Sequence, residues 1–126
     1  NGGHRIIDLG AEEYTRGKPH PVIDPSLLNE WLWREGSDPR TAVLLFDLIL
    51  GYGAHADPVE AIAQTLSALK KEARGTGGHI SIISSLCGSS KDPQDYFKLK
   101  ERLENIGVIV LPSNARAAIL AGMIIS

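Results

Sequence analysis

Four stretches of the chain carry the apolar pattern of β-strands. Residues 42–50 form an almost unbroken apolar run that only Asp47 interrupts, which is typical of a strand buried on both faces of a parallel sheet. Residues 79–87 alternate between apolar and small polar side chains, and residues 108–111 form a short apolar run that ends at a proline. Residues 4–10 favour a short edge strand that stops at glycine. The pattern therefore predicts a sheet whose three main strands follow residue 41.

Apolar residues at helical spacing alternate with these strands. Residues 58–74 present Ile62, Leu66 and Leu69 on one side, and basic residues gather where the helix dipole is negative. Further helices are expected over 25–36 and over 93–105, where Tyr96, Leu99, Leu103 and Ile106 share one face. Asn114 is expected to cap a final helix that runs through Met123. The first three expected helices begin at an Asp-Pro pair, in which an N-cap residue precedes the residue best suited to the first helical position. Strands joined by helical crossovers are parallel, so the sequence predicts an α/β fold.

The loops that follow the three strands are the candidate binding region. In a parallel sheet these loops lie along one edge, where helix N-termini offer free N–H groups to an anion. Glycines, small hydroxyls and one lysine in these loops suit a phosphate or a carboxylate. An ordinary tight turn is the alternative explanation for the glycines. The candidate ligand-binding residues are Gly51, Tyr52, Gly53, Ala54, Gly88, Ser89, Ser90, Lys91, Ser113 and Asn114.

Two residues of the same loops are candidates for catalysis. Cys87 ends the second strand shortly before a helix start, a position in which a thiol can act as a nucleophile. His55 could act as an acid, a base or a transient phosphate acceptor. A buried spectator thiol and an ordinary hydrogen-bonding histidine are the alternatives. The other histidines show no spacing of metal ligands, so no metal is predicted.

Composition narrows the class of protein. The chain has 126 residues, one cysteine and a net charge of −2 from 13 basic and 15 acidic residues. The length predicts one domain, and the absence of a basic stripe argues against a nucleic-acid partner. No signal-peptide pattern or membrane-spanning apolar run is present, which predicts a cytoplasmic protein that does not bind membranes. The start at Asn1-Gly2-Gly3, without methionine, predicts part of a longer protein.

Three motifs in order resemble the carboxyl-terminal part of FdrA proteins, which are relatives of the succinyl-CoA synthetase alpha chain. The motifs are DLGAEEYTRGKPHPVIDP at 8–25, LLFDLILGYGAHADP at 44–58 and LCGSSKDPQ at 86–94. The resemblance covers nearly the whole chain. It implies a single CoA-ligase-like domain over residues 1–126, with a flavodoxin-like, three-layer architecture and a mostly parallel sheet. Residues 1–40 would form a lead-in loop and helix, and residues 41–126 three β-α units.

The sequence departs from the synthetases at the residue that carries their chemistry. Their phosphohistidine loop, a Gly-His-Ala-Gly segment among glycines, has no match here, because Gly78-His79 precedes a predicted strand instead of following it. The turn over residues 51–54 looks like the synthetase turn that approaches that histidine. The resemblance to FdrA proteins also implies a link to carbamoyl transfer with partner subunits. We expect no cofactor in this domain itself, with CoA or a phosphorylated metabolite as the alternative.

Three functions are compatible with these residues. In the first, the domain binds a small phosphorylated or carboxylated ligand, or an acyl thioester, and works with other domains or subunits of an FdrA-like protein. In the second, His55, Cys87 and Lys91 complete an acyl- or carbamoyl-transferase or acid-CoA ligase site that is inactive alone. In the third, Trp33 and the apolar tail over 119–125 dock a partner protein. A homodimer is one form of that third function.

Overall fold

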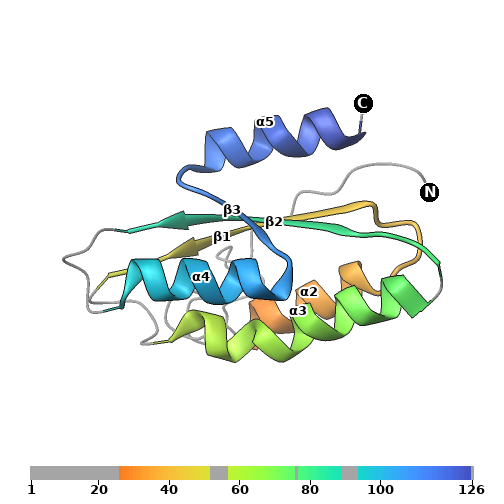
Figure 1. The fold of residues 1–126 in the computed structure, drawn as a ribbon, viewed down its shortest axis with the longest axis horizontal. Coiled ribbons are helices and arrows are strands. Elements are labelled where there is room, and N and C mark those ends of the chain that lie inside the picture. The colour runs from red at the N-terminus through yellow and green to blue at the C-terminus, as the bar shows by residue number, and fades with distance from the viewer. Residues whose placement is uncertain (1–25, 52–56, 76, 89–93, 126) are drawn as a thin grey trace.

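The computed structural model describes residues 26–51, 57–75, 77–88 and 94–125, and in them a parallel sheet lies between two layers of helices. The strands are β1 (Val43–Ile49), β2 (Ser81–Cys87) and β3 (Ile109–Leu111), in the order β1-β2-β3. The helices are α2 (Ser26–Gly36), α3 (Pro58–Gly75), α4 (Tyr96–Ile106) and α5 (Asn114–Ile125). Figure 1 shows α2, α3 and α4 on one face of the sheet and α5 on the other. The predicted α/β fold with parallel strands is confirmed.

The main core lies between the sheet and the layer of α2, α3 and α4. Alternate residues of β1 point into it, because side chains of a strand alternate between the two faces. The predicted stripe of α3 is fully or almost fully buried there, and the stripe of α4 contributes Leu99 and Leu103. The core residues of the strands include Leu44, Phe46, Leu48, Ile82, Leu86 and Val110. The helical periodicity therefore identified the buried faces of α3 and α4 correctly.

The expectation that the first strand is buried on both faces is wrong. In β1 every second residue is exposed, and Leu45 keeps 38% of its surface accessible. The strand that is buried on both faces is β2, which pairs with β1 on one side and with β3 on the other. β1 has one strand neighbour in the described part of the chain, and α5 leaves the outer row of β1 partly open.

The hydroxyl groups of two serines in the buried strand β2 donate hydrogen bonds to acceptors within the domain. Ser84 Oγ donates to the carbonyl oxygen of Ser85 at 3.0 Å, and Ser85 Oγ donates to Asp47 Oδ1 at 2.5 Å. The Nδ2 group of Asn114 also donates to both carboxylate oxygens of Asp47, at 2.8 Å each. Asp47, the residue that interrupts the apolar run, thereby fixes the start of α5 against the open face of the sheet.

Two helices begin differently from the sequence prediction. α4 starts at Tyr96 and not at Pro93, because the Asp95 carboxylate accepts a hydrogen bond from the Lys98 amide at 3.1 Å and caps the helix. At α5, Ser113 Oγ accepts from the Arg116 amide at 3.2 Å, so Ser113 takes the capping role expected of Asn114. The predicted cap at Asp57 is present, since its carboxylate accepts from the Glu60 amide at 3.0 Å.

Some predictions fall outside the described residues, namely the strand over 4–10, the helix start at Asp24 and the loop residues 92 and 93. None of the described helices is both long and apolar enough to cross a membrane.

The unequal burial of the two faces of β1 can be measured with matched leucine substitutions. Leu48 of β1 is almost fully buried on the inner face, so Leu48→Ala should lower the free energy of unfolding by about 2–5 kcal/mol in urea titrations. Leu45→Ala removes the same atoms from the partly open face of β1 and should cost less than half as much. Equal losses would mean that β1 is buried on both faces after all.

Candidate ligand site at the carboxyl edge of the sheet

The ends of β1 and β2 meet at one edge of the sheet. The register pairs Ile49 with Cys87, and the amide of Leu50 donates to the Cys87 carbonyl oxygen at 2.8 Å. Gly51 follows at once, with a positive φ of 153° that residues with a side chain rarely adopt. Of the predicted site residues, Gly51 and Cys87 are therefore brought together, although 35 residues separate them in the sequence.

The side chain of Gln94 holds the backbone of Gly51. Its Oε1 accepts from the Gly51 amide at 3.0 Å, and its Nε2 donates to the Gly51 carbonyl oxygen at 3.0 Å. The Gln94 side-chain amide thus replaces a strand neighbour at the position where the pairing of β1 with β2 stops. Gln94 is only 4% exposed, so the contact is shielded from competing water.

A second contact holds the start of α3. Arg102 of α4 donates to both carboxylate oxygens of Asp57, at 3.2 Å each, and also pairs with Glu60. Gly51 and Asp57 flank residues 52–56, and both are held by residues of the segment 94–106. The end of the first strand and the start of the first crossover helix are therefore tied to the second β-α unit.

Backbone amides at the helix N-termini of this edge already donate hydrogen bonds to carboxylates of the domain itself. The carboxylate of Asp57 caps α3 and that of Asp95 caps α4, so negative charge already lies beside these dipole ends. Arg102 offsets part of this charge through its two ion pairs. An anion at this edge would therefore depend on loop backbone and on cationic side chains more than on these two helix dipoles.

The predicted residues Ser113 and Asn114 lie at the start of α5, on the other face of the sheet. Their side chains bond to the Arg116 amide and to Asp47, and not to Gly51 or Cys87. They fix α5 to the sheet in this structure.

Cys87 carries a free, half-buried thiol at the end of β2, and Gly88 beside it is exposed. The other predicted site residues lie outside the described residues, namely Tyr52, Gly53, Ala54, His55, Ser89, Ser90 and Lys91. Within the described ranges, no cluster of three His, Cys, Asp or Glu side chains could hold a metal ion.

Sequence reasoning missed the two residues that organise this edge, Gln94 and Arg102. A glutamine in the first turn of a predicted helix gives no local signal, since its partner Gly51 is 43 residues away. Arg102 lies on the polar side of an amphipathic helix and resembles an ordinary solvent-exposed residue. Asp47 did give a signal, as the only charged residue in the apolar run over 42–50.

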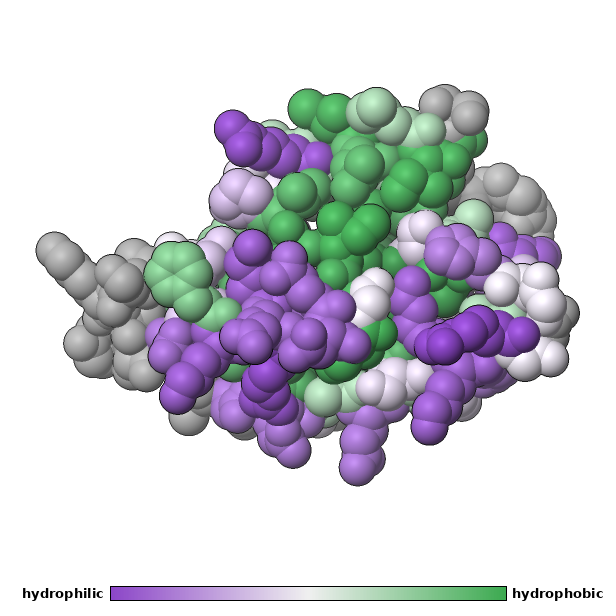
Figure 2. Space-filling view, viewed as in Figure 1, coloured by the Kyte–Doolittle hydropathy of each residue, from purple (hydrophilic) through white to green (hydrophobic). Residues whose placement is uncertain are grey.

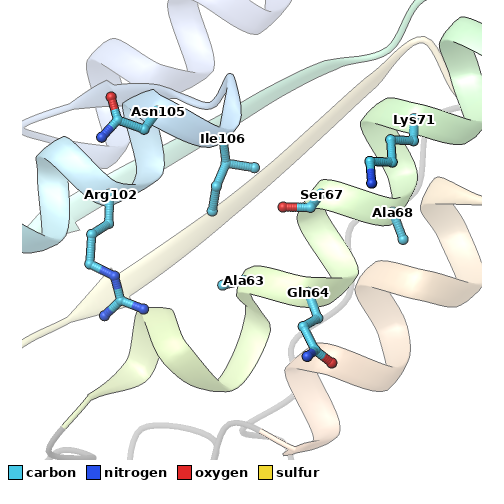
Figure 3. Close-up of a pocket in the computed structure, with 8 residues that line it drawn as sticks. All are labelled: Ala63, Gln64, Ser67, Ala68, Lys71, Arg102, Asn105 and Ile106. Atoms are coloured by element: carbon cyan, nitrogen blue, oxygen red, sulfur yellow. The ribbon is translucent and has the colours of Figure 1, made fainter.

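A shallow groove of about 520 Å³ lies between α3 and α4, on the outside of the helical layer. Figure 3 shows Ile106 and Ser67 on its two sides, and Arg102 and Lys71 toward its two ends. Two cationic side chains line the groove, Arg102 and Lys71, and Arg102 is already bonded to Asp57 and Glu60. These ion pairs weaken the attraction of the groove for an anion. We do not assign the ligand site to it.

Residues 1–124 match the CoA-ligase family, and the parallel α/β fold is consistent with that match. The chain belongs to that family. It is similar to protein YahF of Escherichia coli (strain K12), which is described as uncharacterized, with 34% identity over 118 residues. This match covers 94% of the chain but 23% of YahF, so the chain spans about a quarter of the length of that relative.

The pairing of Gln94 with Gly51 predicts a local effect of substitution. Gln94→Met keeps most of the volume but removes both hydrogen bonds, so the free energy of unfolding should fall by about 1–3 kcal/mol. Hydrogen exchange at the Gly51 amide should accelerate more than exchange in α3. The control Gln64→Met, on the exposed side of α3, should change neither quantity. Unchanged exchange at Gly51 in Gln94→Met would contradict the role assigned to Gln94.

Proposed function

We propose that this CoA-ligase domain binds a small anionic ligand at the carboxyl edge of its sheet and acts together with other domains or subunits of an FdrA-like protein. The ligand is a phosphorylated or carboxylated metabolite, such as an acyl or carbamoyl phosphate, or an acyl thioester of CoA. The observation that carries the proposal is the pair of hydrogen bonds between the Gln94 side chain and Gly51. They fix the backbone of Gly51 beside Cys87, so this edge is preorganised in the unliganded domain.

The preorganisation of this edge favours ligand binding because less backbone entropy is lost on binding. A loop that is ordered only on binding costs about 1–2 kcal/mol of backbone entropy per residue, which weakens the affinity. Here Gln94 and Arg102 order both flanks, at Gly51 and Asp57, within the unliganded domain. The segment over 52–56, which contains Gly53 and lies between these fixed residues, is therefore the proposed contact region, with Lys91 as the proposed cationic partner.

Acyl or carbamoyl transfer is the second candidate function. The free, half-buried thiol of Cys87 lies at the strand end beside Gly51, where a bound acyl compound would be within reach. In this function Cys87 is the nucleophile, His55 the acid or base, and the remainder of the protein completes the site. Cys87→Ser separates the two candidates, because it should abolish transfer in the complete protein while leaving ligand binding by the domain intact.

Thermal-shift titration tests the binding proposal with phosphate, CoA, succinyl-CoA, ADP and carbamoyl phosphate. A ligand that binds only the folded state should raise the melting temperature, with about 2.7 kcal/mol of stabilisation at a hundredfold excess over its dissociation constant. Gly51→Ala should reduce this shift, because its backbone at φ 153° disfavours a side chain. Gly75→Ala is the matched control, since nothing lies within 4 Å of the added Cβ and its φ is ordinary. No saturable shift with any of the five compounds would contradict the proposal.

A further inference from the structure

The outer face of α5 is an apolar and largely exposed surface. From Ala117 to Ile125 the helix has no charged residue, yet only Ala117 is buried. Ile119 is 64% exposed and Met123 is 69% exposed. Figure 2 shows the apolar side chains gathered over α5, above the polar surface of the helices on the other face. A helix that is apolar all round is normally buried on every side.

The outer face combines large and small side chains in a regular order. Helical spacing directs Ala117, Leu120 and Ala121, which are buried or half-buried, toward the sheet. The exposed side of the helix then carries Ile119 and Met123 next to Ala118 and Gly122. Apart from the nearby backbone of α5 itself, no heavy atom lies within 4 Å of the position that a Cβ on Gly122 would occupy, so the space beside Gly122 is open.

We propose that α5 pairs with α5 of a second copy of this chain, with the two helices antiparallel. If the two-fold axis passes between residues 120 and 121, Ile119 lies level with Gly122 of the second copy. In the same register Met123 lies level with Ala118 of the second copy. Each large side chain thus meets a small residue, which is the condition for close helix packing.

The distribution of charge favours a second copy in this orientation. The only charged residue of α5 is Arg116, in its first turn, and the last turn has no basic residue to offset the negative end of the helix dipole. The antiparallel register places Arg116 level with Ile125 of the second copy, beside that last turn. A parallel pair would instead bring the two Arg116 side chains together, and their charges would repel each other.

The mass of the chain in solution tests the proposal. Sedimentation equilibrium should give twice the 13.6 kDa of one chain. Met123→Glu should return the protein to the monomer, because a charged carboxylate would then lie in the apolar contact, level with Ala118 of the second copy. Phe97→Glu is the matched control: Phe97 is also 69% exposed but lies on α4, on the opposite face, and the variant should stay dimeric. A monomer at all concentrations, or a dimer that survives Met123→Glu, would overturn the proposal.

Disulfide cross-linking tests the antiparallel register. With Cys87 replaced by serine, Ile119→Cys should form a linked dimer on oxidation, because three residues separate the two positions by about 4.5 Å along the helices. Arg116→Cys should not, because nine residues, or about 13.5 Å, separate its two copies. A dimer linked through Arg116→Cys and not through Ile119→Cys would overturn the antiparallel arrangement.

Discussion

The packing of β2 between two helical layers is the constraint on which the rest of the structure depends. Ile82 and Leu86 belong to the core on the side of α3 and α4, and Ile83 and Ser85 face the side of α5, all almost fully buried. The strands on either side take their register from β2. β2 ends at Cys87, and the ends of its neighbouring strands and the starts of the crossover helices lie at the same edge of the sheet. Asp47 holds α5 over the face of the sheet that is opposite α3 and α4.

The carboxyl edge gains its order from contacts between the first two β-α units. Gln94 forms two hydrogen bonds with the backbone of Gly51, and Arg102 pairs with Asp57, so both flanks of residues 52–56 are held from the same segment. These contacts join residues 43 and 45 positions apart in the sequence. A ligand that rearranged residues 52–56 would therefore also act on α4. Binding at this edge would thus be linked to the layer formed by α2, α3 and α4.

The sequence was sufficient for the local features of the fold. Helical periodicity identified the buried stripes of α3 and α4, and runs ending in glycine or proline located the strands, because both signals depend on residues that are close in sequence. Which strand is central depends on long-range packing, so the apolar run of β1 was assigned to a strand buried on both faces. The buried strand is instead β2, whose Ser84 and Ser85 are small enough to lie under helices and find hydrogen-bond acceptors.

The candidate site was only partly predictable for the same reason. Parallel connectivity was enough to bring Gly51 and Cys87 together. It did not predict that Ser113 and Asn114 would be engaged at α5, because that depends on Asp47 being on the face that α5 covers. Nor could it select Asp95 over Asp92 as the cap of α4, since both are suitable residues. Gln94 gave no signal because its role requires a partner at the end of another strand.

The most direct test of ligand binding at this edge is a two-dimensional ¹⁵N–¹H NMR titration with carbamoyl phosphate and with CoA. The account predicts that the backbone amides of Gly51 and Cys87 and the side-chain amide of Gln94 shift together and saturate at one ligand concentration, while Ile119 and Met123 stay unchanged. Shifts confined to the groove between α3 and α4, around Ser67 and Asn105, or no saturable shifts with either compound, would contradict it.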